Sequence, residues 1–311
     1  MDVRETPYYK QTDLLLQVLP IIAKIDAFAL KGGTAINLFV RNLPRLSVDI
    51  DLTYLPLDDR GTALHNISKH LNQISEESQV IFRDCHISIK QQKGLLYGLI
   101  ITQNGVTIKI EPNTTIRGAV FPSEVLRLCS KAQDIFGRSI DVQTLSLEDL
   151  YGGKICAALD RQHPRDLYDV YHLYKNEGIT DKIRTAFIVY LLSHNRPIAE
   201  LLDPQLKDDL DETYQESFEG MAFDPVPLGD MVETWKKVIQ KLNNDFTEEE
   251  REFILSFKRK SPKWDLFPIK NIQHLPAIQW KMKNLERMSS KKHKAACEKL
   301  ERVLQRGGSN V

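Results

Sequence analysis

The sequence predicts an α+β fold, in which a mixed or antiparallel sheet with flanking helices is followed by a mainly helical C-terminal half. Runs of alternating apolar and polar residues, typical of strands, recur up to residue 111. A pair of glycines, Gly32 and Gly33, separates a short apolar run from a helical pattern. From Ser146 onward the helical period dominates. We therefore expect three regions, at 1–145, 146–220 and 221–311.

Length and composition are those of an ordinary globular protein. At 311 residues the chain exceeds one typical domain, and 42% hydrophobic with 27% charged residues excludes a disordered, collagen-like or disulfide-stapled protein. The polar start and the lack of any apolar run of about 20 residues predict a cytoplasmic protein with no membrane segment. The four cysteines are dispersed, which favours reduced thiols over a metal site.

The first 40 residues predict a helix over 13–23, a strand over 28–30, a glycine turn at 32–33 and a helix over 34–39. Pro20 must kink or end the first of these helices. Glycines in a strand-to-helix turn let the backbone approach a phosphate group, and the following helix offers free amides. The alternative is a plain tight turn with Thr34 as an N-cap.

The next apolar run, residues 47–54, predicts a strand with two acidic side chains on one face. Ile50 and Leu52 alternate with Asp49 and Asp51, so both carboxylates point the same way. Their repulsion is costly unless a cation lies between them. Mg²⁺ prefers a few carboxylates together with substrate phosphate oxygens, which suits phosphoryl or nucleotidyl transfer. An exposed acidic pair with no metal is the alternative.

A meander follows, with strands expected over 80–90, 95–103 and 106–111 and turns at Lys93-Gly94 and Asn104-Gly105. Glu111 ends the last of these strands, opposite the apolar face of Ile108 and Ile110. It is our candidate for a third carboxylate, which would act as general base or share a second metal ion. Because Lys109 shares its side, a surface ion pair is the alternative.

Six helices are expected in the second half, near 147–161, 165–175, 180–194, 229–243, 246–258 and 282–304. Lys154 and Arg161 share one face of the first, where Lys suits a point contact to phosphate and Arg a bidentate contact to phosphate or carboxylate. Pro164 suits the start of the second helix, and Asp166 and Asp169 share a face of it. The alternatives are an exposed cationic face and carboxylates that favour the helix dipole.

Taken together, these motifs resemble those of the AbiEii/AbiGii-type nucleotidyltransferase toxins, which belong to the DNA polymerase β-like superfamily. Gly32-Gly33-Thr34 is similar to the family's Gly-Ser/Thr motif, and Asp49 with Asp51 to its Asp-x-Asp. Residues 154–161 are similar to its Lys-x-x-Ala-x-x-x-Arg helix, and Arg165-Asp166 with Asp169 to its Arg-Asp-x-x-Asp motif. The resemblance covers roughly residues 28–175.

The resemblance implies a toxin of a bacterial toxin–antitoxin or phage-defence pair. Such an enzyme transfers a nucleotide from an NTP and releases pyrophosphate, with tRNA as the acceptor in the better-understood relatives and an antitoxin as partner. Mg²⁺ would be the cofactor, at a one- or two-ion site.

The resemblance also assigns roles to residues. Asp49 and Asp51 would hold Mg²⁺, and Gly32, Gly33 and Thr34 would bind phosphates. Lys154 and Arg161 would bind the triphosphate, Asp166 would carry an essential polar role, and Arg165 and Asp169 would support it. Glu111 stands where the family more often has Asp. The site would then be shared between the α/β half and the region 146–220.

The last part of the chain is strongly basic. Residues 251–311 hold 15 of the 42 lysines and arginines and 5 of the 42 acids, which leaves 27 against 37 in the rest. Such a segment could follow a phosphate backbone, with Trp264 or Trp280 stacking on a base. The runs concerned are Lys258-Arg259-Lys260, Lys263 and Lys291-Lys292-His293-Lys294. A solvated face, or a tail that docks on the acidic body, is the alternative.

Two other functions fit the same residues. A nucleotidyltransferase could modify a small molecule such as an aminoglycoside, or a protein, although the basic tail disfavours the small molecule. A catalytically silent module could use the aspartates only to bind a cation or a nucleotide. The complete set of Asp49, Asp51, Lys154 and Asp166 argues against the silent module.

Overall fold

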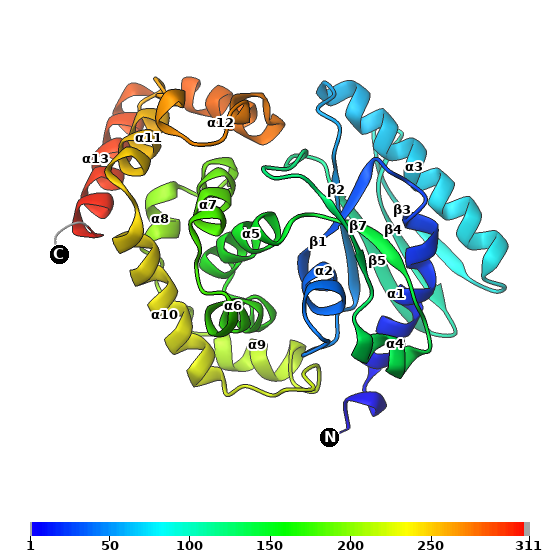
Figure 1. The fold of residues 1–311 in the computed structure, drawn as a ribbon. Helices are drawn as coiled ribbons and strands as arrows, with labels where there is room; N and C mark the ends of the chain where they lie inside the picture. Colours follow the sequence, from blue (N-terminus) through cyan, green and yellow to red (C-terminus); the bar gives the residue numbers. More distant parts are fainter. Residues whose placement is uncertain (1, 308–311) are drawn as a thin grey trace. The chain divides into compact units, whose positions relative to one another are not determined.

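A computed structural model describes residues 2–307, and these form two compact units. The first unit contains the chain up to Leu150 together with Phe218–Pro225, and the second contains Tyr151–Ser217 and the chain from Val226 on (Figure 1). The three regions expected from the sequence stay predictions. No helix in the described part of the chain is long and apolar enough to cross a membrane.

A seven-stranded sheet forms the core of the first unit. Its strands are β1 (Phe28–Lys31), β2 (Asp49–Tyr54), β3 (His86–Gln92), β4 (Leu95–Gln103), β5 (Val106–Asn113), β6 (Glu124–Arg127) and β7 (Asp141–Thr144). They lie in the order β3-β4-β5-β2-β1-β7-β6. The pairs β2–β5 and β1–β7 are parallel and the others antiparallel, so the predicted mixed sheet is confirmed.

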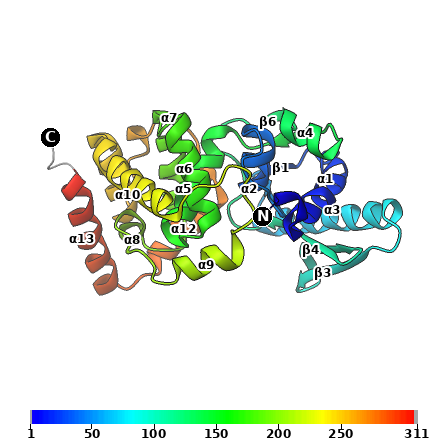
Figure 2. The same ribbon diagram turned by 90° about the horizontal axis from the view of Figure 1, so that it is seen from below.

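Two long helices, α1 (Pro7–Ile22) and α3 (Arg60–Ile81), pack on the sheet of the first unit (Figures 1 and 2). Pro20 lies within α1, which continues for two more residues and then ends. The short helices of this unit are η1 (Val3–Glu5), α2 (Gly32–Ala35), η2 (Ile36–Val40) and α4 (Ser130–Phe136). The strand expected from residue 80 begins only at His86, because α3 continues to Ile81.

Both turns of the predicted meander have the expected conformation. Lys93 and Gly94 have φ angles of 51° and 79°, and Asn104 and Gly105 have 50° and 76°. Positive φ at both central residues is the mark of a type I′ hairpin, which matches the twist of the flanking strands. These turns fix the register of β3, β4 and β5.

The second unit is built of helices. They are α5 (Leu147–Asp160), which begins in the first unit, α6 (Pro164–Asn176), α7 (Asp181–Ser193), α8 (Ile198–Leu202), α9 (Leu210–Ser217), α10 (Leu228–Asp245), α11 (Glu248–Lys258), η3 (Trp264–Leu266), η4 (Ile272–His274), α12 (Pro276–Glu286) and α13 (Ser290–Gly307). The single helix expected over 282–304 is wrong. Ser289 starts a new helix there, because its carbonyl accepts from His293 N, and serine favours helix starts over helix interiors.

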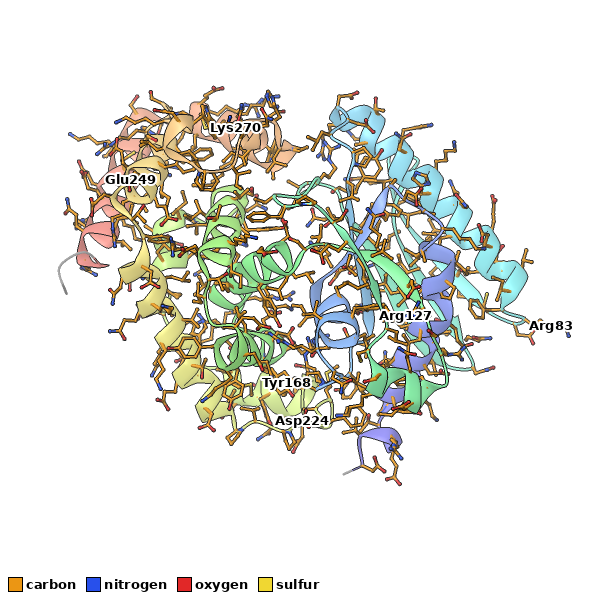
Figure 3. The ribbon with its side chains drawn as sticks, in the orientation of Figure 1. Arg83, Arg127, Tyr168, Asp224, Glu249 and Lys270 are labelled. Atoms are coloured by element: carbon orange, nitrogen blue, oxygen red, sulfur yellow. The ribbon has the colours of Figure 1, made fainter. Side chains whose placement is uncertain are left out.

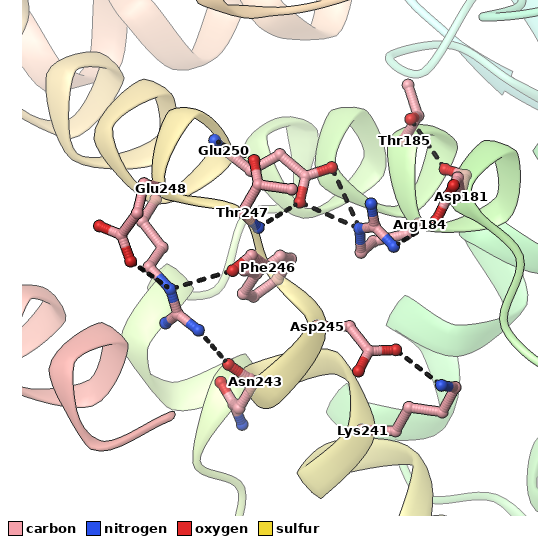
Figure 4. A network of polar contacts seen from close by, with 11 residues as sticks. Asp181, Arg184, Thr185, Lys241, Asn243, Asp245, Phe246, Thr247, Glu248 and Glu250 are labelled. Atoms are coloured by element: carbon pink, nitrogen blue, oxygen red, sulfur yellow. Dashed lines mark hydrogen bonds and ion pairs between the residues drawn. The ribbon is translucent and has the colours of Figure 1, made fainter. Parts of the chain in front are cut away.

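Buried polar contacts attach α11 to α7 and to α13 in the second unit, and Figure 4 shows those between α7 and α11. Arg184 of α7 donates to both carboxylate oxygens of Glu250 on α11, at 3.1 and 3.0 Å. Arg251 donates to the carbonyl oxygens of Phe246 and Leu304, and Leu304 lies on α13. Leu300, next to this contact, is also fully buried, so apolar residues of the basic segment contribute to the core of this unit.

Candidate active site

The two aspartates lie on one face of β2, as the alternation requires. Asp49 and Asp51 are half-buried, whereas Ile50 and Leu52 are fully buried on the opposite face. On the parallel neighbour β5, Glu111 lies directly beside Asp51. Residues paired in this way have their side chains on the same face. The structure therefore brings the third candidate carboxylate next to the pair.

Glu111 forms an ion pair, but its partner is Lys90 rather than Lys109. Lys90 Nζ on β3 lies 2.5 Å from Glu111 Oε1, and both side chains keep partial contact with solvent. The hydrogen bond to Glu111 raises the pKa of Lys90, so the lysine stays charged. Nothing in the sequence around Lys90 indicates this contact, which joins strands that are not neighbours in the sheet.

The glycine turn comes into contact distance of the acidic pair. Gly32 has φ +71°, a conformation that side chains rarely adopt, and it is the first residue of α2. A Cβ at this position would lie 2.6 Å from Asp51 Oδ2, which is closer than non-bonded atoms approach. Only glycine therefore lets the helix start beside the carboxylate.

Thr34 is buried and fixes this turn to β2. Its Oγ1 donates to the carbonyl of Asp49 at 2.5 Å and shares a hydrogen bond with Ser47 Oγ at 2.9 Å. The alternative that Thr34 is an N-cap is wrong, because Lys31 occupies that position. A Cβ on Gly33 would lie 2.6 Å from Arg45 Nη2. The Thr34 hydroxyl is thus engaged within the protein, and phosphate binding at this turn stays a prediction.

The acidic face fits a divalent cation that arrives with its substrate. Among residues 2–307 no three acidic, histidine or cysteine side chains are grouped so that they alone could hold a metal ion. Mg²⁺, however, is usually bound through one or two carboxylates and completes its shell with substrate phosphates and water. Asp49 and Asp51, half-buried on one strand face, provide that kind of donor set.

In the second unit, Lys154 and Arg161 are joined by buried carboxylates. Lys154 Nζ lies 2.8 Å from Asp166 Oδ1 and 3.0 Å from Asp169 Oδ2. Arg161 makes two hydrogen bonds to Asp166, of 2.5 and 3.0 Å. The side chain of Lys154 is 6% exposed, so the alternative of an exposed cation is wrong for this residue, whereas Arg161 is 60% exposed.

Asp166 is the centre of this network. Burial would raise the pKa of its carboxyl, but the charge of Lys154 and the hydrogen bond from Arg161 outweigh burial and hold it well below its ordinary value. Pro164 is the first residue of α6, as predicted, and His163 caps the helix by accepting from Arg165 N at 3.1 Å. The start of α6 thus fixes where Asp166 lies.

The matches to known proteins can be set against this geometry. A family model for the nucleotidyl transferase AbiEii toxin of type IV toxin–antitoxin systems matches residues 13–256. Among solved structures, the chain is similar in fold to MenT4, a nucleotidyltransferase toxin from Mycobacterium tuberculosis H37Rv, with 13% identity and a TM-score of 0.59 over 97% of this chain and 94% of that chain. No curated protein matches the sequence.

Replacing Gly32 by Ala is expected to abolish activity. The left-handed backbone costs about 1–2 kcal/mol of stability, and the new Cβ pushes the Asp51 carboxylate away, which costs at least about 100-fold in turnover. Gly137→Ala is the matched control, because Gly137 has φ +62° with nothing within 4 Å of a Cβ. Urea unfolding should show similar destabilisation of both variants. Nucleotide-transfer assays should show an activity defect only for Gly32→Ala. Equal activity in both variants would contradict the close approach to Asp51.

Replacing Asp166 by Asn is expected to lower the free energy of unfolding by about 3 kcal/mol at pH 7, because it leaves buried charge unbalanced. Since the pKa of Asp166 is lowered from 3.8 in the folded protein, its contribution is complete above that pH and is lost as the pH falls below it. The difference between variant and wild type should therefore shrink in acid. Asp141→Asn, which breaks the exposed pair with Arg127, should change stability little. Equal stability of the two variants would contradict this role of Asp166.

Proposed function

The chain belongs to the AbiEii family of nucleotidyl transferase toxins of type IV toxin–antitoxin systems, and we propose that it transfers a nucleoside monophosphate from an NTP to tRNA with Mg²⁺ at Asp49 and Asp51. The close approach of the glycine turn to the acidic strand carries this proposal. A Cβ at Gly32, the first residue of α2, would lie 2.6 Å from Asp51 Oδ2, so the backbone at the start of this helix lies next to the carboxylate. A substrate that carries both phosphate groups and a metal ion would use a helix start and a carboxylate together.

The proposed reaction is a displacement at the α-phosphorus of the NTP. A hydroxyl oxygen of the acceptor forms the new bond, the bond to the β-phosphate oxygen breaks, and pyrophosphate leaves. Divalent cations at such sites neutralise the charge that develops on the phosphate oxygens. Amides of Gly32 and Gly33 would orient the phosphates, and Glu111, beside Asp51, would accept the hydroxyl proton or join the metal.

In the second unit we propose that Arg161 binds phosphate. Its guanidinium is exposed, and two bonds to Asp166 fix its position. Lys154 and Asp169 complete that support, because Lys154 bridges the two buried carboxylates. A direct contact of Lys154 with the triphosphate stays a prediction, and so does a supporting role for Arg165.

For the acceptor we propose contacts with a basic surface at the end of α12 and the start of α13. It consists of Lys283, Arg287, Lys291, Lys292 and Lys294, which are exposed and form no ion pair within the described part of the chain. Lys291 and Lys292 stand in the first turn of α13, which holds no acidic residue. Cations there oppose the helix dipole, a cost that a bound phosphate backbone would offset.

Other basic residues of the segment 251–311 differ from this basic surface in burial or in ion pairing. Lys258 is buried, and Arg259 and Lys263 pair with Glu301 and Glu252. Lys270 is exposed as well (Figure 3) but lies before α12.

The two tryptophans of the segment 251–311, Trp264 and Trp280, differ in their surroundings. Trp264 packs against Phe253 at 5.8 Å between ring centroids, whereas Trp280 is 43% exposed. Trp280 is therefore our candidate for stacking on a base.

The family implies an antitoxin partner for this chain. A cytoplasmic toxin, restrained by that antitoxin and used in phage defence, is the cellular role that we propose. NTPs and tRNA are both available in that compartment.

One labelling experiment tests the activity. The purified chain is incubated with each labelled NTP and Mg²⁺ in the presence of total tRNA, protein extract or an aminoglycoside, beside the Asp49→Ala variant. We expect label on tRNA that falls by about 1,000-fold in the variant, since the missing metal would otherwise stabilise the transition state by several kcal/mol. Label on protein or on the small molecule would replace tRNA as the acceptor. No label with any of them would favour the silent module.

Charge substitutions test the acceptor surface. We expect Lys283→Gln, Lys291→Gln and Lys292→Gln together to weaken tRNA binding and to lower the slope of log affinity against log salt by about 0.7–0.9 for each phosphate that is no longer neutralised. Lys299→Gln is the control, because Lys299 lies on the same helix but pairs with Glu200. Deleting residues 251–311 would not test tRNA binding alone, because apolar residues of this segment are buried in the core. An unchanged salt slope in the triple variant would refute the proposal that this basic surface binds tRNA.

A further inference from the structure

A row of charged side chains crosses the sheet of the first unit at the level of Asp51. Asp51 pairs with Lys31 on β1 and with Glu111 on β5. On the far side of β4, Lys90 of β3 pairs with Gly98. The residue after Gly98, Leu99, pairs with the residue before Glu111, so Gly98 lies between Lys90 and Glu111. The position between the two charges therefore carries no side chain.

Gly98 opens the path by which Lys90 reaches Glu111. A Cβ at position 98 would lie 3.4 Å from Lys90 Cδ and 3.2 Å from the carbonyl oxygen of Ile110. The aliphatic stem of Lys90 thus runs directly over the glycine. A glycine inside a strand weakens the sheet, and it often marks a bulge or the close approach of another group; the register of β3 and β4 does shift directly after Lys90. Here the approaching group is Lys90, whose Nζ ends 2.5 Å from Glu111 Oε1.

This ion pair engages the carboxylate that a metal would also need. Lys90 additionally interacts electrostatically with Asp49, so its positive charge acts on two of the three carboxylates. Within residues 2–307 the three carboxylates do not form a group that could hold a metal ion. A divalent cation and the Lys90 ammonium group are both positive, so a metal ion at Glu111 is repelled by Lys90 while its Nζ stays 2.5 Å from Glu111 Oε1.

We infer that Lys90 competes with the divalent cation for Glu111, so that the third carboxylate joins the metal only when Lys90 is displaced. Lys90 is then a positioning residue, which acts through Glu111 and is placed by Gly98. This inference rests on the proposed metal site at Asp49 and Asp51. It adds a residue from the edge strand β3 to the site and makes metal affinity, rather than stability, the property that Lys90 controls.

Binding of Mn²⁺ to the full chain without nucleotide, measured by calorimetry, tests the inference. Lys90→Met should bind Mn²⁺ about tenfold more tightly, because a unit charge a few ångströms from the metal is removed and Glu111 is released. Lys90→Arg keeps the charge and should stay close to wild type. Gly98→Val blocks the path of Lys90 and should shift the affinity in the same direction as Lys90→Met.

A double-variant cycle shows whether the effect passes through Glu111. In the Glu111→Gln background, Lys90→Met should lose most of its gain in affinity. Unchanged or weaker Mn²⁺ binding by Lys90→Met, or an equal gain in both backgrounds, would overturn the inference. Asp49→Ala separates this result from the proposed function. If Asp49→Ala abolishes Mn²⁺ binding while Lys90→Met changes nothing, the metal site stands and the role of Lys90 falls. If Asp49→Ala binds as wild type does, the metal site falls, and the role of Lys90 with it.

Discussion

The close approach of Gly32 to the Asp51 carboxylate is the constraint on which the candidate site depends. It requires a residue without a side chain and with positive φ at the point where β1 ends. The hydrogen bond from Thr34 to the carbonyl of Asp49 then holds the start of the helix against β2. β1, the glycine turn and α2 thus hold one another in place. The aspartates occupy the face of β2 opposite its buried apolar residues.

The candidate site residues of the two units differ in the burial of their charges. In the first, the carboxylates of Asp49, Asp51 and Glu111 keep contact with solvent, so an ion can reach them. In the second, Asp166 is completely buried and is balanced by Lys154 and Arg161. A buried ion pair is costly to break, which suits a rigid support. A half-exposed carboxylate can change its partner at a small free-energy cost, which suits a site where ligands exchange.

Local patterns predicted much of this arrangement, and long-range contacts did not follow from them. The alternation in β2, the two type I′ turns and Pro164 at the start of α6 depend only on neighbouring residues. The ion pair of Lys90 depends on the order of three strands, and the burial of Lys154 depends on where α6 packs. The four-residue strands β6 and β7 were missed, whereas the equally short β1 was predicted from its apolar run and the glycine turn that follows it.

The attachment of α13 has a genetic consequence. Arg251 donates to the carbonyl of Leu304, and Leu300 is fully buried beside it. A premature stop codon before residue 300 would therefore remove part of a folded core rather than a loose extension. Cells that survive expression of such a toxin would be expected to carry truncations there as readily as changes in the acidic strand.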